Sequence, residues 1–300
     1  MGEICEFFRT QGKIKNESAK GAFERSTDLM QNLIFGLDKQ TLIPIVMEIG
    51  AIPEDIRHDS SEEKLYAKVS DIVLAKCFQE FGLKSSVNKE RANCADVMAK
   101  SQYHGYSLVG DAKSFRLSRT AKNAKDFKVA SIGGWKGDSD YAVLVCPYFQ
   151  YPKSRSQIYG QALNDNVALF SWEYLSVLLE NNVVETHNAN IANLWNLSFL
   201  LSGNINVLDK NNSFLDRQDE LLRTYLKLDQ ENFSGYFSRY KASIITRGED
   251  EIKYWEVKAN EIKLYSRERA IKELLESLKL SEKIVTIKKY IDSLREEQGE

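Results

Sequence analysis

The chain has 300 residues, enough for one large domain or two modest ones. Hydrophobic residues make up 43% of it and charged residues 28%, which is ordinary for a globular protein. The formal net charge of −2 excludes a chain that is basic throughout, so any affinity for nucleic acid has to come from a local patch.

Helices are predicted for most of the N-terminal part. Apolar residues recur at helical spacing over 28–37 and 39–49, although Pro44 interrupts the second segment. A longer helix with acidic residues in its first turn is predicted over 61–81. We expect residues 1–60 to form an N-terminal helical segment that packs on the core of the protein.

Short apolar runs alternate with helical patterns in the middle of the chain. The predicted order is helix 61–81, strand 95–99, strand 106–112, helix 118–129, strand 141–146, helix 155–163, strand 167–170 and helix 171–180. Gly133 and Gly134, together with Asp138–Asp140, indicate a flexible loop before the third of these strands. The alternation predicts an α/β fold with a mixed central β-sheet flanked by helices, over residues 61–200.

The last third of the chain is predicted to be helical. It is rich in Leu, Ile, Glu, Lys and Arg, and its apolar residues recur at helical spacing, as over 271–278. Turn residues from Gly203 to Asn206 separate it from the core. We expect residues 205–300 to form an α-helical C-terminal region.

Several classes of protein lack their sequence signals here. No apolar run reaches the roughly 18 residues of a membrane span, and the N-terminus lacks the layout of a secretory signal. The cysteines are scattered and the histidines are isolated, so neither a disulfide framework nor a zinc site is predicted. No glycine-rich phosphate loop is present, which argues against a nucleotide cofactor. We expect a reduced, cytoplasmic protein without a membrane partner.

Two carboxylates and a lysine are predicted to meet at one edge of the sheet. Asp111 and Lys113 lie at the end of strand 106–112, where residues two apart project to the same side. Asp96 reaches the same place if its strand pairs with that one as a hairpin. In one interpretation, Lys113 is the counter-ion of a structural ion-pair network. In the other, Asp96 and Asp111 bind Mg²⁺ while Lys113 orients or helps to deprotonate a nucleophilic water.

A basic segment follows these residues. Between 111 and 128 the chain has six basic and two acidic residues, so the rest of the protein is net acidic. The candidate DNA-binding residues of this segment are Arg116, Arg119, Lys122, Asn123, Lys125 and Lys128. They form either a solvated helix or a segment that contacts phosphates and base edges of a duplex. The second interpretation favours hydrolysis of a nucleic-acid phosphodiester at the carboxylates nearby.

Other polar and aromatic residues have weaker functional interpretations. Glu63 and Asp71 are candidates for groups around a metal, but within an amphipathic helix they are expected at the surface or as capping groups. The aromatic segment 148–152 is expected to pack as a loop on the core. Trp172 and Trp195 are expected to be core residues.

With these residues in view, the chain resembles a known family. Asp96, Asp111 and Lys113 are similar to the PD-(D/E)xK nuclease pattern, with Ala95 in place of its proline. Longer strings are similar to those of the HindIII-type type II restriction endonucleases, namely Asp71–Lys76, Gly110–Asn123, Asp126–Val129, Asp140–Leu144 and Phe149–Pro152. The resemblance is specific over residues 40–180.

The resemblance implies a restriction-endonuclease-like core of the EcoRI-like type. It implies a homodimer that uses Mg²⁺ to cut both strands of the palindrome AAGCTT after the first A. Asp96 and Asp111 are then metal ligands and Lys113 is the catalytic lysine. The two-fold symmetry of a dimer matches that of palindromic double-stranded DNA. The C-terminal helices then serve dimer contacts or embrace DNA.

Two alternative functions stay open on the sequence. A structure-specific nuclease, such as a junction resolvase, would cut branched DNA whatever its sequence. A non-enzymatic DNA-binding protein would bind DNA in a salt-sensitive manner without cutting it.

Overall fold

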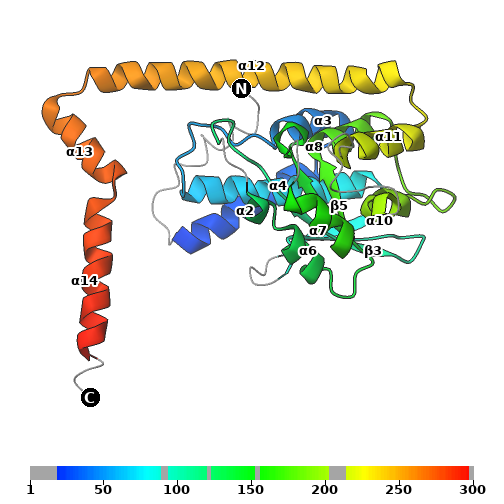
Figure 1. Ribbon diagram of the computed structural model, residues 1–300, viewed down its shortest axis with the longest axis horizontal. Helices are drawn as coiled ribbons and strands as arrows, with labels where there is room; N and C mark the ends of the chain where they lie inside the picture. Colours follow the sequence, from blue (N-terminus) through cyan, green and yellow to red (C-terminus); the bar gives the residue numbers. More distant parts are fainter. Residues whose placement is uncertain (1–18, 89–93, 120–122, 153–155, 203–213, 297–300) are drawn as a thin grey trace. The chain divides into compact units, whose positions relative to one another are not determined.

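The structure is a computed structural model that describes residues 19–88, 94–119, 123–152, 156–202 and 214–296 (Figure 1). Its contacts divide the chain into two compact units, Met1–Thr246 and Arg247–Glu300. The organisation expected from the sequence, with segments 1–60, 61–200 and 205–300, stays a prediction.

Three helices precede the sheet, namely α2 (Ala19–Phe35), α3 (Lys39–Glu48) and α4 (Ser61–Glu80). The side chain of Asp38 accepts a hydrogen bond from the backbone N–H of Thr41 and caps α3. Ser60 caps α4 in the same way, and Gly82 follows its end with a φ of +84°, a backbone conformation that glycine adopts without strain. The helices predicted over 39–49 and 61–81 are therefore confirmed.

One five-stranded sheet forms the centre of the first unit. Its strands are β1 (Lys84–Val87), β2 (Val97–Lys100), β3 (Ser107–Ala112), β4 (Tyr141–Cys146) and β5 (Val167–Ser171), and they lie in that order. β1, β2 and β3 pair antiparallel, whereas β3, β4 and β5 pair parallel. The predicted mixed sheet is confirmed. β1 was not predicted, because its sequence Lys-Ser-Ser-Val lacks an alternating apolar pattern.

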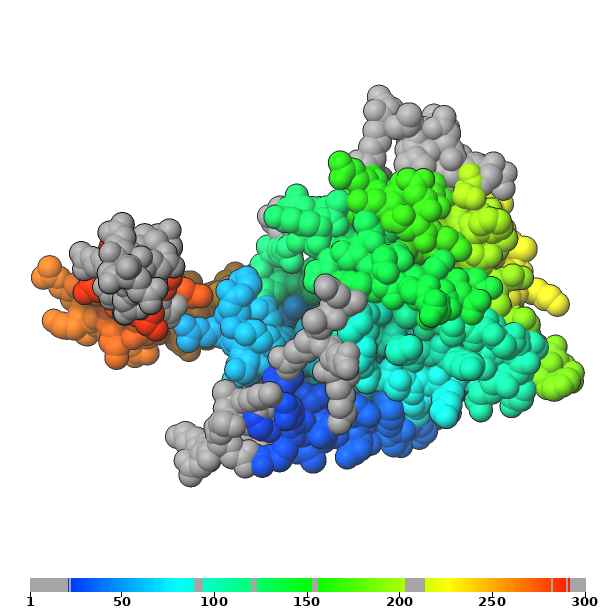
Figure 2. Space-filling model, turned by 90° about the horizontal axis from the view of Figure 1, so that it is seen from below, coloured from blue at the N-terminus to red at the C-terminus, as the bar shows by residue number. Residues whose placement is uncertain are grey.

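Helices cover both faces of this sheet (Figure 1). α2 packs along α4, and α4 contacts β1, β2 and β3. On the other side, α6 (Val129–Trp135) and α7 (Gln157–Asp165) contact β4 and β5. Each face has its own hydrophobic cluster, and successive residues of β4 alternate between the two clusters, as expected of a strand buried on both sides. Figure 2 shows one side of the unit, on which blue N-terminal residues, teal residues near 100 and green residues near 140 follow one another.

The prediction of one helix over 118–129 is wrong. The chain forms two short helices there, α5 (Ala124–Phe127) and α6, and they are separated by Lys128 at a φ of +53°. The loop expected before β4 is confirmed at Asp138–Asp140 but is wrong at Gly133 and Gly134, because both glycines lie within α6. A Cβ on Gly133 would come within 2.7 Å of the Cβ of Asp165, so this glycine allows α6 to approach α7 closely.

The remaining elements of the first unit complete its two cores. They are η1 (Tyr148–Gln150), α8 (Trp172–Glu180), α9 (Ala192–Trp195), α10 (Leu197–Ser202), α11 (Phe214–Leu226) and the beginning of α12 (Gln230–Lys263). Trp172 and Trp195 are buried, as predicted. Tyr151 of the aromatic segment is buried as well, and its hydroxyl donates a hydrogen bond to the carbonyl of Phe170. The thiols of Cys77 and Cys146 lie in the core.

The second unit contains the end of α12 together with α13 (Arg267–Ser277) and α14 (Leu280–Glu296). Ser266 caps α13 through the backbone N–H of Arg269. The predicted helical C-terminal region is confirmed for 214–296. No residue of α13, which is described in full, is buried. Among the described residues, no helix is both long enough and apolar enough to cross a membrane.

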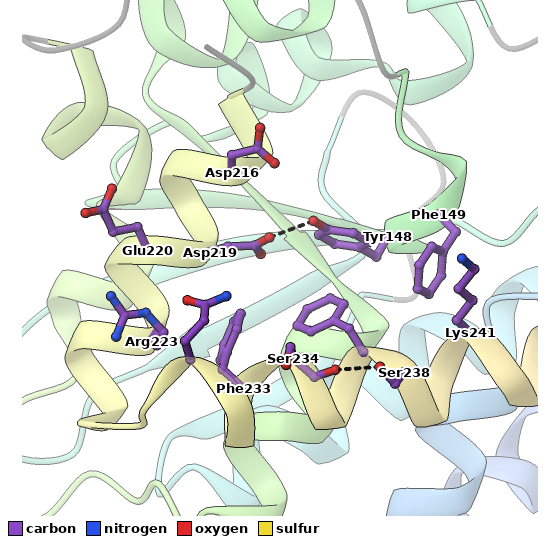
Figure 3. A pocket seen from close by; sticks show the side chains of 12 residues that line it. Tyr148, Phe149, Asp216, Asp219, Glu220, Arg223, Phe233, Ser234, Ser238 and Lys241 are labelled. Carbon is purple, nitrogen blue, oxygen red and sulfur yellow. Dashed lines mark hydrogen bonds between the residues drawn. The ribbon is translucent and has the colours of Figure 1, made fainter. Parts of the chain in front are cut away.

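A cavity of about 570 Å³ lies between η1, α11 and α12 (Figure 3). Tyr148 and Phe149 line it together with Phe233 and the acidic residues Asp216 and Asp219. The hydroxyl of Tyr148 donates a hydrogen bond of 2.7 Å to Asp219. Burial raises the pKa of Asp219 to about 6, and the hydrogen bonds from two tyrosines oppose that shift. This cavity shares no lining residue with the candidate site residues predicted from the sequence.

We predict that Glu173→Gln stabilises the protein above neutral pH. Burial raises the pKa of Glu173 from 4.5 to about 7, while the backbone N–H of Tyr148 donates to its carboxyl group. The folded state therefore keeps a proton that the unfolded chain has lost, and the free energy of unfolding falls as pH rises through this window. Glutamine does not ionise, so the variant gains about 3 kcal/mol over the parent between pH 4.5 and pH 7. Urea unfolding at both ends of this range measures the gain, and a difference that does not change with pH would contradict the prediction.

Candidate metal centre

The register of β2 and β3 places two carboxylates opposite each other. Val97 pairs with Gly110 in the antiparallel ladder, so Asp96, one residue before β2, faces Asp111. This is the hairpin on which the sequence prediction for Asp96 depended, and the hairpin is confirmed. Asp111 is the fifth residue of β3 and lies beside Leu144 of β4.

Helix α4 brings a third carboxylate to the same place. Asp71, Leu74 and Phe78 lie on one face of α4, because residues three, four and seven apart share a helical face. A Cβ on Gly110 would come within 3.1 Å of Leu74 and 3.2 Å of Phe78, so glycine allows α4 to lie close to β3. Asp71 is one turn before Leu74 and therefore reaches the end of the strand at Asp111.

The three acids form a compact cluster. Asp71, Asp96 and Asp111 each offer one carboxylate oxygen, and these oxygens all lie within 4.8 Å of one another. Asp71 and Asp111 are 5% and 1% exposed, whereas Asp96 is half-buried. The expectation that Asp71 lies at the surface or caps the helix is therefore wrong.

Burial makes the negative charge of this cluster unfavourable. It raises the pKa of Asp71 well above its usual range, and the nearby Asp96 carboxylate raises it further, whereas Lys68 opposes the shift. Burial also raises the pKa of Asp111, and Lys113 opposes that shift through its charge and its hydrogen bond. A cation between the three carboxylates would relieve this repulsion.

Lys113 is fixed beside Asp111. Its ammonium donates a hydrogen bond to Oδ1 of Asp111, so the two side chains lie together, as predicted. The backbone of Lys113 is held by two hydrogen bonds, one through its N–H and one through its carbonyl. Its N–H donates to the carbonyl of Val145 at 2.7 Å, and its carbonyl accepts from Nε1 of Trp172 at 3.0 Å.

Lys68 is a second cation at the cluster. Its Nζ lies 3.6 Å from Oδ2 of Asp71 and 3.4 Å from Oδ1 of Asp96. The site thus combines three carboxylates with two ammonium groups. Sequence reasoning missed both Lys68 and the placement of Asp71. A sequence signal for Asp71 was present, because it is an acid within the largely apolar stretch from Val69 to Phe78, and that stretch is buried on all sides of α4.

One of the predicted DNA-binding residues, Arg116, contacts other parts of the protein. The guanidinium of Arg116 donates to the carboxylate of Glu63 and to the carbonyls of Pro53 and Ile56, at 2.7 to 3.1 Å. Arg116 therefore connects the segment after β3 to the first turn of α4. Contact between Arg116 and DNA stays a prediction. Glu63 also accepts from the backbone N–H of Asp59, which agrees with its expected capping role.

The other candidate DNA-binding residues follow Arg116 in the chain. Arg119 pairs with Asp126 at 2.7 Å and lies over the ring of Phe115. Asn123 is the N-cap of α5 in a capping box. Lys125 and Lys128 are exposed. Lys122 lies outside the described residues.

The donor set fits a hard divalent cation such as Mg²⁺. Carboxylate oxygens are its preferred protein ligands, and the three acids converge to the spacing that a shared ion requires. A second group of possible ligands, His58, Asp59 and Glu63, is largely exposed, and Glu63 is already paired with Arg116. The cluster of Asp71, Asp96 and Asp111 is therefore the candidate metal centre.

Comparisons with known proteins identify relatives of this chain. The family model described as HindIII restriction endonuclease matches residues 13–291. The type II restriction enzyme HindIII of Haemophilus influenzae is 41% identical over 273 residues, which is 91% of this chain and 91% of that enzyme.

Solved structures of the restriction endonuclease FokI are more distant. One has a TM-score of 0.34 at 11% identity and covers 61% of this chain and 34% of its own. One of FokI bound to DNA has a TM-score of 0.30 at 11% identity and covers 57% of this chain and 31% of its own. The chain thus spans about a third of FokI. Similarity at this level carries no weight for function.

We predict that Asp71→Asn weakens metal binding and stabilises the metal-free protein. The change removes one of three carboxylates that repel one another, so the midpoint of thermal unfolding in EDTA rises. It also removes a proposed ligand, so the Kd for Mg²⁺ rises about tenfold or more, or about 1.4 kcal/mol. Calorimetric titration with Mg²⁺ and thermal unfolding at pH 8 measure the two effects.

Asp138→Asn is the matched control, because Asp138 is an exposed acid in the turn before β4. It is expected to change neither quantity. Equal Mg²⁺ affinity in the parent and in Asp71→Asn would exclude Asp71 from the metal site.

Proposed function

The chain belongs to the HindIII restriction endonuclease family, and from that premise we propose that it uses Mg²⁺ to hydrolyse both strands of a palindromic DNA site at the cluster of Asp71, Asp96 and Asp111. As a member of this family it is a type II restriction enzyme, a site-specific deoxyribonuclease that binds DNA. The family relationship favours this function over a junction resolvase and over a non-enzymatic DNA-binding protein. Action on DNA agrees with the cytoplasmic location expected from the sequence.

The convergence of three carboxylates and Lys113 is the observation that supports this site. Asp96 and Asp111 are the metal ligands proposed from the sequence, and we add Asp71 as a third. When bound, Mg²⁺ supplies charge neutralisation at the scissile phosphate and lowers the pKa of a coordinated water. Structural ion pairing alone leaves negative charge in excess, because the two ammonium groups of Lys68 and Lys113 face three carboxylates.

Lys113 has the position of a catalytic lysine. Its backbone is held by Val145 and Trp172, so its ammonium stays at the edge of the sheet beside Asp111. From there it orients the attacking water, or it helps to deprotonate that water once its own ammonium has released a proton. Asp111 holds the ammonium in that place until the substrate arrives.

Contacts to the duplex are assigned to the exposed basic residues after β3. Lys125 and Lys128 are proposed to meet phosphates, which fixes the register of the protein on DNA without reading sequence. Arg119 and Asn123 stay candidates for contacts to base edges. The family relationship makes AAGCTT, cut after the first A, the proposed target.

A homodimer is proposed because a palindrome presents two equivalent strands to cut. We define the C-terminal apolar face as Ile271, Leu274, Leu275 and Leu278, each about half exposed. The first three share one side of α13 at the spacing of an amphipathic helix, and Leu278 is the C-cap residue of that helix. A helix of this length is marginal in water unless its apolar side is covered.

A second copy of the chain is the proposed occupant of the C-terminal apolar face. Between 247 and 296 the sequence has 12 basic and 11 acidic residues. A surface that embraces DNA needs a clear excess of basic residues. Nearly balanced charge around exposed apolar residues instead favours a protein interface between two identical surfaces.

Two changes at the site test the nuclease function. We predict that Asp111→Asn and Lys113→Ala abolish cleavage of a plasmid in the presence of Mg²⁺, with at least the roughly 10²- to 10⁴-fold loss expected on removal of a proton-transfer group. Binding to the same DNA persists, because neither residue is a proposed phosphate contact. Gel analysis of the plasmid measures cutting, sequencing of the termini identifies the site, and mobility shift measures binding.

Asp138→Asn serves again as the control and is expected to cut at the parental rate. Normal cutting by Asp111→Asn or by Lys113→Ala would refute the assignment of the site. Termini at random positions in the parent digest would refute the proposed site specificity.

The dimer has its own test. We predict that Leu274→Glu combined with Leu278→Glu converts the dimer into a monomer, because an interface does not tolerate unpaired buried carboxylates. Light scattering measures the mass in solution. Glu273→Gln, on the same helix but outside the C-terminal apolar face, is expected to stay dimeric. A dimer that survives the double change would show that another surface holds the two copies together.

A further inference from the structure

Lys68 occupies the space between two of the proposed metal ligands. It lies on α4, three residues before Asp71, so both side chains are on the same face of that helix. Its Nζ is 3.6 Å from Asp71 and 3.4 Å from Asp96, and it donates a hydrogen bond of 3.0 Å to the carbonyl of Asn88. The side chain is 19% exposed, so water screens this contact only in part.

The two ammonium groups at the cluster have different partners. Lys113 pairs with Asp111, whereas Lys68 pairs with Asp71 and Asp96. Between Asp71 and Asp96, the ammonium of Lys68 does what a metal ion would do there, since it neutralises charge and holds two carboxylates together. A divalent cation bound by the same oxygens would lie within a few ångströms of Lys68, and two cations that close repel each other.

We propose that Lys68 is a built-in counter-ion that competes with the divalent metal for Asp71 and Asp96. In the metal-free protein it holds these two carboxylates together, and it must withdraw from them when the metal binds. The carbonyl of Asn88 gives its ammonium a remaining partner after that withdrawal. Lys68 is thus a positioning residue that lowers metal affinity in exchange for a stable metal-free protein. The inference rests on the proposed function in that it takes these acids to be metal ligands.

Lys68→Gln tests the inference, because glutamine keeps a donor for the Asn88 carbonyl and removes the charge. We expect the Kd for Mg²⁺ of the DNA-free full chain to fall about tenfold, since the competing cation is gone. We also expect the midpoint of thermal unfolding in EDTA to fall, since Asp71 and Asp96 lose their counter-ion. Isothermal titration with MgCl₂ and thermal unfolding with and without Mg²⁺ measure these quantities.

Two further variants separate charge from packing. Lys64→Gln removes an exposed lysine one turn earlier on the same helix and is expected to leave both quantities at parental values. Lys68→Arg keeps the charge and is expected to leave Mg²⁺ affinity near that of the parent. Unchanged or weaker Mg²⁺ binding in Lys68→Gln would overturn the proposal, as would an equal gain in Lys64→Gln.

A double variant covers the case in which Lys68→Gln does not fold well. Lys68→Gln combined with Asp71→Asn removes the cation together with one of its two partners, so Asp71→Asn is expected to raise stability in EDTA more in the Lys68→Gln background than in the parent. An equal gain in both backgrounds would overturn the pairing of Lys68 with Asp71. If the parent chain itself does not bind Mg²⁺, the proposed metal site fails. If the parent binds Mg²⁺ and Lys68→Gln changes nothing, this inference alone fails.

Discussion

The rest of this structure depends on how three neighbouring carboxylates, two of them buried, are stabilised in the folded protein. The oxygens of Asp71, Asp96 and Asp111 lie within 4.8 Å of one another, and burial raises the pKa of both Asp71 and Asp111. Such a cluster folds because cations lie against it, and Lys68 and Lys113 supply them. The same repulsion explains how the site would hold a divalent ion, since a metal bound there relieves an interaction that destabilises the folded protein.

The backbone around the cluster decides where these charges lie. Antiparallel pairing of β2 with β3 sets Asp96 opposite Asp111, and the parallel pairing of β3 with β4 continues into the hydrogen bond from Lys113 to Val145. Gly110 lets α4 approach the sheet closely, which brings Asp71 over the end of β3. A larger residue at 110 would move the helix outward and separate the third carboxylate from the other two. Proposed catalysis in this enzyme thus depends on packing between a helix and a strand as much as on the acids themselves.

Prediction from the sequence succeeded where the deciding contacts were local. Asp111 lies near the end of β3 and Lys113 follows that strand directly, so the geometry of extended chain alone placed them together. Asp71 was expected at a surface because α4 was interpreted as an amphipathic helix, whereas its residues from Val69 to Phe78 are all buried. The helix expected over 118–129 failed at Lys128, whose left-handed backbone conformation divides α5 from α6. Gly133 was interpreted as a loop residue, although its contact is with Asp165 of another helix.

The sequence by itself determined the type and order of the main elements, the mixed sheet, the pair formed by Asp111 and Lys113, and the family. It did so because periodicity, capping residues and motif spacing act within short stretches of chain. Only the tertiary structure decided that Asp71 and Lys68 join the site, and that Arg116 contacts Glu63 within the protein. Those outcomes depend on strand register and helix packing between distant segments, and no local pattern of side chains specifies either of them.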